Sequence, residues 1–114
     1  MKFTRYWLPV IIYASIIFYL SSIPGDDIPG LFPYQEVVFH IVEYSILALL
    51  LSRAFKAYNH PLGYSRRLLW VVFLTILYAV SDEFHQSFVP NRHPSLIDLT
   101  YDSVGAFIAN IFYR

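Results

Sequence analysis

Carboxylates, an amide and an arginine follow one another over residues 81–93, SDEFHQSFVPNRH, directly after an apolar run. Asp82 and Glu83 could act as general acid and base or hold a divalent cation. Gln86 lies one helical turn after Asp82 and shares its helix face. Arg92 could hold a phosphate or carboxylate through its planar fork of donors. This segment is therefore the first candidate site.

Two further segments, 40–44 and 98–102, carry ionisable residues at the spacing of a helix face. In HIVEY the histidine, glutamate and tyrosine lie at i, i+3 and i+4, and in DLTYD the two aspartates lie at i and i+4. A helix rises about 1.5 Å per residue. If the helices alternate in direction, all three segments place these groups roughly 5–10 Å from one shared end of the helical bundle. We therefore expect one shared site. Its candidate catalytic residues are Asp82, Glu83, Asp98 and His40, and its candidate ligand-binding residues are Arg92, Gln86, Glu43, Tyr44 and Asp102.

The charges of this expected site do not balance. The site contains five acids and one permanent cation, Arg92. Its histidines are cations only when they are protonated. Protonated carboxylates, charged histidines, or a bound cation or cationic ligand would restore the balance. Oxygen ligands with histidine suit Mg²⁺, Mn²⁺ or Zn²⁺, so a divalent cation is a candidate cofactor whose identity stays open. The chain has no cysteine, which excludes thiolate ligands and disulfides.

The elements that must position these residues are predicted to be membrane-spanning helices. Of the 114 residues, 57% are hydrophobic and only 14% are charged, against about 25% charged in an ordinary soluble domain. A membrane helix needs about 20 mostly apolar residues. Such runs fall at about 6–23, 36–57, 68–89 and 95–113. We predict a single domain over 1–114, an all-α membrane protein with four transmembrane helices in a compact bundle.

The distribution of charge predicts how this bundle is oriented. Seven of the eight lysines and arginines fall on one side of a four-span arrangement, and Arg92 falls on the other. Basic residues favour the cytoplasmic side, so we expect cytoplasmic N- and C-termini in a multi-pass protein of the bacterial plasma membrane. All eight acids lie toward the opposite side, so the site is expected to face outside. The first span is too long for the apolar core of a cleaved signal peptide, so we expect it to be retained.

Each part of the site also has a purely structural interpretation. The polar residues of 82–92 could form a solvated helix end, and the two aspartates of the fourth span could stabilise a helix start, where acids are favoured. His40 and Glu43 could form an interhelical hydrogen-bond pair. Ser21 and Ser22 fit helix packing better than a nucleophile. No basic run exists that could follow a nucleic acid, so none is expected as a partner.

The segment 81–105, SDEFHQSFVPNRHPSLIDLTYDSVG, is similar to the signature of the VanZ-like family of small membrane proteins. HIVEYSILALL resembles the family's earlier His-x-x-x-Tyr-x-x-Leu block, and YLSSIPG resembles the end of its first helix. Asp102 departs from the family pattern, which often has asparagine there. Gly105 is followed by Ala109, a small-xxx-small pair that lets a membrane helix approach its neighbour closely. The residues that match the signature are Asp82, Glu83, Gln86, Arg92, Asp98 and Gly105.

The resemblance implies a role at the outer cell envelope, because the family takes its name from a teicoplanin-resistance protein. It supplies no reaction, and three functions stay open. The site could bind an envelope lipid headgroup, a cell-wall precursor or a glycopeptide. It could instead belong to a membrane-embedded hydrolase or transferase that acts on an envelope lipid by acid–base or metal-assisted chemistry, or to a transport or proton-relay element. The expected partners are the lipid bilayer and such a ligand, and the oligomeric state stays open.

Overall fold

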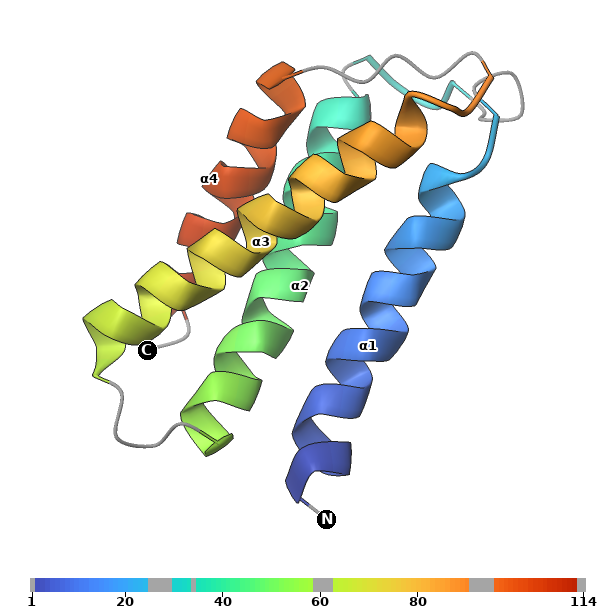
Figure 1. Ribbon diagram of the computed structural model, residues 1–114. Helices are drawn as coiled ribbons and strands as arrows, with labels where there is room; N and C mark the ends of the chain where they lie inside the picture. The colour runs from blue at the N-terminus through green and yellow to red at the C-terminus, as the bar shows by residue number, and fades with distance from the viewer. Residues whose placement is uncertain (1, 25–29, 34, 59–62, 91–95, 113–114) are drawn as a thin grey trace.

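The chain folds as four helices that run alternately up and down, as Figure 1 shows. The computed structural model describes residues 2–24, 30–33, 35–58, 63–90 and 96–112, without the side chains of 2, 3, 58, 96, 98 and 112. All regular structure in these ranges is helical, which confirms the all-α class. The helices are α1 (Lys2–Ser21), α2 (Gln35–Tyr58), α3 (Tyr64–Gln86) and α4 (Leu96–Phe112).

The bounds of α3 differ most from the apolar run at 68–89. The helix begins at Tyr64, directly after Gly63, because serine and arginine are compatible with a helical turn although they are not apolar. It ends at Gln86, four residues before Pro90, because proline has no N–H to donate to the Gln86 carbonyl and its ring crowds that group. Hydropathy therefore located the helix but misplaced both of its ends.

Helix α2 forms the centre of the packing, since it contacts α4 most extensively and also contacts α1 and α3. Its buried face follows helical spacing through His40, Tyr44, Leu47, Ala48 and Leu51. Small residues of the neighbouring helices meet this face, with Ala79 in α3 and Ala106 and Ala109 in α4 all buried. The core is consequently narrow, and the backbones of α2 and α4 approach closely.

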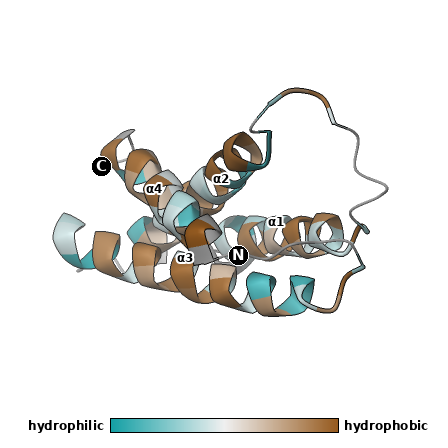
Figure 2. Cartoon of the chain, turned by 90° about the horizontal axis from the view of Figure 1, so that it is seen from above, coloured by the Kyte–Doolittle hydropathy of each residue, from teal (hydrophilic) through white to brown (hydrophobic). Residues whose placement is uncertain are grey.

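The outer surface of the bundle is apolar, which is the reverse of a soluble domain. On α3 the exposed side chains include Leu69, Phe73, Leu77 and Phe84 at helical spacing, whereas its buried face carries arginine, aspartate and glutamine. Figure 2 shows hydrophobic residues along the outward surfaces of the helices. Two helices, over 35–57 and 64–86, are long and apolar enough to cross a bilayer, and most of each is unburied. This pattern indicates a membrane protein.

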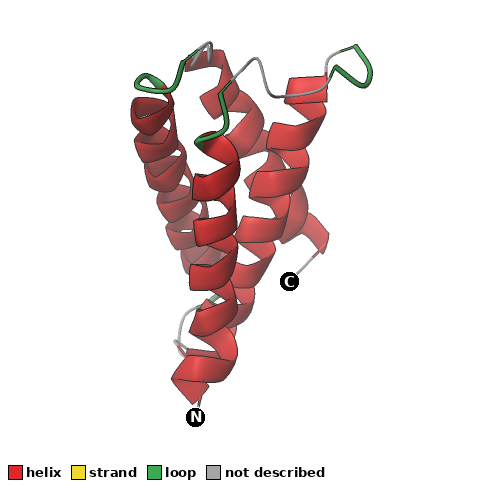
Figure 3. Ribbon diagram, turned by 90° about the vertical axis from the view of Figure 1, so that its right-hand side faces the viewer, coloured by secondary structure: helices red, strands yellow, loops and turns green. Residues whose placement is uncertain are grey.

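The two ends of the bundle carry opposite charge. We define the basic end by Arg5, Arg53, Lys56, Arg66 and Arg67, and α1 begins and α4 finishes toward it. We define the acidic end by Glu36, Glu43, Asp82, Glu83 and Asp102, where α1 and α3 finish and α2 and α4 begin. Most of the described loop residues lie at the acidic end, as Figure 3 shows. The fold thus separates the acids from the permanent cations of the described chain.

Candidate functional site

Asp82 is the carboxylate that joins three helices at the acidic end. It lies one turn before the end of α3 and is 5% exposed. Ser21 of α1 donates a hydrogen bond to its Oδ1, and the hydroxyl of Tyr44 in α2 donates to its Oδ2 over 2.8 Å. A buried carboxylate that accepts two hydroxyl donors is not part of a solvated helix end, so that interpretation is wrong for Asp82.

His40 and Asp102 form a second polar contact, between α2 and α4. The Nδ1 atom of His40 lies 2.9 Å from Oδ1 of Asp102, and both side chains are buried. Asp102 is the seventh residue of α4, so it is too far along the helix to stabilise the helix start. The interhelical interpretation of His40 is confirmed through Asp102 of α4.

The two contacts belong to one continuous cluster, because His40 and Tyr44 are adjacent on the same face of α2. Their rings are almost parallel, at an interplanar angle of 4°, with centroids 6.1 Å apart. We call these five residues, which come from all four helices, the polar network: Ser21, His40, Tyr44, Asp82 and Asp102. Buried polar groups are stable only when they are hydrogen-bonded, so these contacts fix how the four helices are rotated against one another.

The remaining predicted site residues lie around the network or outside the described part. Gln86 is buried one turn after Asp82, and Glu43 and Glu83 are half-buried at the same end. Asp98 lies in α4 one turn before Asp102, but its side chain is not among those described. Arg92 lies outside the described residues. The structure therefore brings four of the nine predicted residues, His40, Tyr44, Asp82 and Asp102, into direct contact, and their functional roles remain predictions.

The side chains described at the acidic end do not form a metal site by themselves. Among the described residues, no group of three or more histidine, aspartate or glutamate side chains is arranged to hold a metal ion. The expected site also included Asp98, whose side chain lies outside this set. The divalent cation stays a prediction.

Ser21 is the member of the network that was not among the predicted site residues. It was expected to serve helix packing, and it does connect two helices, but it does so through the central carboxylate. The sequence could have indicated Ser21 by its position, because it lies at the end of the first helix, at the same level as the other polar groups. The neighbouring Ser22 lies 3.2 Å from Nε2 of His85, whose ring stacks on Phe18. His85 thus contacts α1 outside the network.

A second buried polar cluster connects α2, α3 and α4 in the half of the bundle toward the basic end. Ser52 donates to the side-chain oxygen of Asn110 over 2.6 Å, and the hydroxyl of Tyr64 donates to the Asn110 carbonyl over 2.9 Å. The Asn110 amide in turn donates to the carbonyl of Ala106. These groups are hydrogen-bonded to one another, so the cluster stabilises the packing of α4 against α2 and α3.

Comparison with known proteins identifies a family. The family described as VanZ/LLP1 matches residues 6–114, which is nearly the whole chain. A comparison with curated proteins gives no significant match, and neither does a comparison with solved structures. The match includes every member of the polar network and the segment 81–105 that resembles the family signature. The chain therefore belongs to the VanZ-like family.

Proposed function

We propose that this VanZ-like protein is a multi-pass protein of the bacterial plasma membrane that binds a polar envelope ligand at its acidic end. The ligand is an envelope lipid headgroup, a cell-wall precursor or a glycopeptide, and binding a glycopeptide would link the protein to teicoplanin resistance. The observation that carries this proposal is the Asp82 carboxylate held between Ser21 and Tyr44 beside the His40–Asp102 pair. Ionisable groups inside a membrane bundle are costly and mark functional sites by default.

The charge of the acidic end supports a ligand that presents a cationic group. Five acids are described there, and the described residues at that end include no lysine or arginine. His40 and His85 are the histidines described beside them, and each carries charge only when protonated. An ammonium group of the ligand would therefore be attracted to this end. Arg92 is proposed to hold the phosphate or carboxylate of the same ligand through its fork of donors.

The His40–Asp102 pair favours a second candidate function, that of an envelope-lipid hydrolase or transferase. A carboxylate that accepts from Nδ1 of a histidine fixes the ring and supports Nε2 as a general base or acid. In this proposal His40 moves the proton, while Asp82 and Glu83 stabilise charge on the substrate. The position of Asp102, 2.9 Å from His40, is the geometric support for it.

Replacement of Asp82 by asparagine is expected to weaken ligand binding by about tenfold or more, because a charged partner of the ligand is lost. The wild-type protein and the variant would be titrated in phosphatidylcholine nanodiscs with teicoplanin, phosphatidylethanolamine and a lipid-linked cell-wall precursor. Glu36→Gln is the matched control, since Glu36 is an exposed acid at the same end. An equal loss in both variants, or no saturable binding of any of the three, would contradict the proposal.

The same incubation separates binding from catalysis. A binding protein returns each ligand with its mass unchanged, whereas a hydrolase or transferase changes the mass of one of them. In the second case His40→Gln should abolish the change while Glu36→Gln retains it. Mass spectrometry of the recovered ligands is the measurement.

The proposed orientation is expected to show in single-cysteine labelling, for which the chain is suited because it has no native cysteine. Arg92→Cys should react with a membrane-impermeant maleimide on intact cells, since the acidic end is proposed to face outside. Arg66→Cys, at the basic end, should react only after permeabilisation. The reverse pattern would place the site in the cytoplasm and exclude the envelope ligands.

A further inference from the structure

Arg67 is a buried cation at the basic end, far from the polar network. It is 6% exposed, whereas its neighbour Arg66 is exposed. Long side chains in helices point back toward the N-terminus, and the guanidinium carbon of Arg67 lies 5.5 Å from the ring centroid of Tyr64, the first residue of α3. Its charge is therefore directed at the start of the helix.

The guanidinium of Arg67 is under-satisfied. Its Nε and Nη2 atoms are buried and have no hydrogen-bond partner within the described ranges. A buried charge without a partner is strongly destabilising, and an arginine stays charged in proteins. All five acids whose side chains are described lie toward the acidic end. An anion at the basic end would supply acceptors for these two donors and balance the charge.

The start of α3 offers further donors to such an anion. Gly63 is the N-cap residue, its backbone is extended at φ −67° and ψ 167°, and no side chain caps the helix. The N-terminus of a 23-residue helix carries a partial positive charge and first-turn N–H groups that suit phosphate. The Tyr64 ring, which the guanidinium overlies, is fixed by its hydroxyl bond to the Asn110 carbonyl. The donors of Arg67 are thus held at the helix start.

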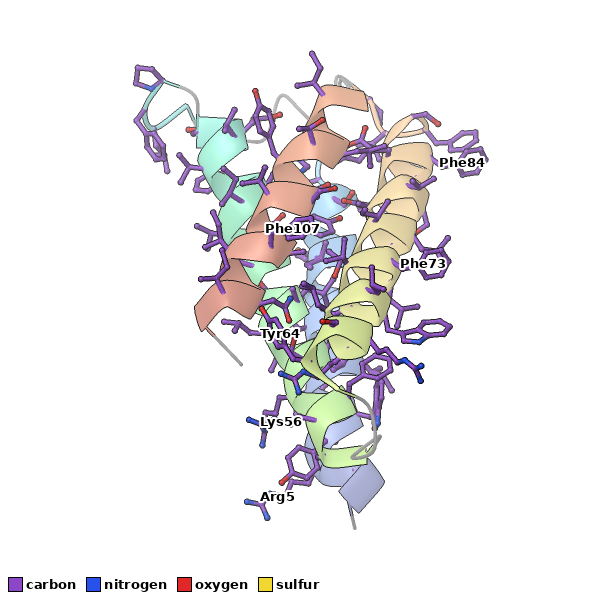
Figure 4. The ribbon with its side chains drawn as sticks, turned by 90° about the vertical axis from the view of Figure 1, so that its left-hand side faces the viewer. Arg5, Lys56, Tyr64, Phe73, Phe84 and Phe107 are labelled. Atoms are coloured by element: carbon purple, nitrogen blue, oxygen red, sulfur yellow. The ribbon has the colours of Figure 1, made fainter. Side chains whose placement is uncertain are left out.

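We propose that Arg67 and the first turn of α3 bind a phosphoryl oxyanion at the basic end. Arg67 contributes its planar donors, and the helix start contributes N–H groups and its dipole. Figure 4 shows Lys56 and then Arg5 beyond Tyr64 toward the basic end of the bundle, where their charges add to a positive field. Such basic sites between membrane helices suit the phosphate of an anionic lipid headgroup, and free phosphate offers the same chemistry.

Two arms of one experiment distinguish these sources. The full chain is placed in phosphatidylcholine nanodiscs, and either phosphatidylglycerol is added to the bilayer or inorganic phosphate is added to the buffer. Sodium chloride at matched ionic strength controls for screening. Native mass spectrometry counts bound lipid, and the thermal unfolding midpoint reports either ligand as a saturable rise.

Arg67→Gln is expected to weaken binding by about tenfold or more, because the charge and the fork are both lost. Arg67→Lys should weaken binding less. The lysine variant also provides a decisive test if the glutamine variant does not fold. Arg66→Gln, the matched exposed arginine, should weaken it by less than about fivefold. Saturation in either arm supports the site and identifies its source. Saturation in neither arm, or equal losses at 66 and 67, would overturn it.

Discussion

Replacement of Gly105 by alanine is expected to lower the free energy of unfolding by about 1–3 kcal/mol, and replacement by leucine to lower it further. A Cβ at position 105 would lie 2.7 Å from the carbonyl oxygen of Ile41 and 3.2 Å from the amide nitrogen of Ser45. Both are backbone atoms of α2 and cannot rotate away. The two helices would have to separate, although α2 and α4 form the most extensive contact in the bundle.

The contact between Ser45 and α4 would be disturbed by the same change. Ser45 Oγ lies 3.0 Å from the carbonyl oxygen of Gly105, and it lies 3.0 Å from where the new Cβ would be. Alanine favours a helix over glycine by up to about 1 kcal/mol, which offsets part of the steric cost. The leucine variant has the larger volume and therefore gives the clearer result.

The measurement is unfolding in mixed micelles of sodium dodecyl sulfate and a mild detergent. Gly30→Ala is the matched control, because Gly30 is exposed and a Cβ there would meet nothing within 4 Å. If Gly105→Ala unfolds at the same detergent composition as Gly30→Ala, the close approach of α2 and α4 does not stabilise the bundle.

Gly105 also shows what the sequence could predict. Its spacing to Ala109 predicted that the fourth helix approaches a neighbour closely, and the 2.7 Å that would separate a Cβ at position 105 from the Ile41 carbonyl oxygen confirms it. The partner helix could not be predicted, because the spacing of small residues marks a face but does not name what packs against it. The number of helices was predicted correctly, because an apolar run is a property of local composition that can be read from the sequence.

The sequence predicted how far along each helix the residues of the polar network lie, but not which side chains face the interior. Helical rise placed His40, Asp82 and Asp102 at one level, and the structure connects that level by hydrogen bonds. Glu43 was assigned to the same face as His40, yet it is only half-buried, whereas Tyr44 is fully buried. A difference of one residue turns a side chain by about 100° on a helix, and tertiary packing decides which of the two faces inward.

Arg67 is a second residue whose burial could not be predicted from the sequence. Its charge predicted only which end of the bundle is cytoplasmic, and Arg66 beside it gave the same signal. The structure buries Arg67 and exposes Arg66. Helix rotation again makes the difference, and no property of either residue in the sequence distinguishes them.

Replacement of Asp82 by alanine is expected to lower the free energy of unfolding by about 2–5 kcal/mol. Tyr44 is 0% exposed and Ser21 is 4% exposed, so both hydroxyls would lose their acceptor in the interior. A buried donor without an acceptor costs about 1–3 kcal/mol. Water can enter the space of the lost carboxylate only if polar partners remain there, which sets the lower end of the range.

A double-mutant cycle isolates the contact between Asp82 and Tyr44. Tyr44→Phe removes one donor, and its combination with Asp82→Ala should cost less than the sum of the two single changes. The expected coupling is about 1.5–3 kcal/mol, the range for a hydrogen bond to a charged group. Tyr19→Phe is the matched control, because Tyr19 is 69% exposed and should add to Asp82→Ala within about 0.5 kcal/mol. Additivity of the Tyr44 pair would show that the hydroxyl does not depend on the carboxylate.

The asparagine variant separates the structural role of Asp82 from its proposed role in binding. Its amide oxygen can still accept one hydroxyl, so Asp82→Asn should lose less stability than Asp82→Ala. Its charge is gone, so a cationic ligand should lose as much affinity as it does with alanine. Stability should therefore follow the number of hydrogen bonds that position 82 accepts, whereas affinity should follow its charge. If affinity instead falls in proportion to stability across the two variants, Asp82 acts on the ligand only through the fold.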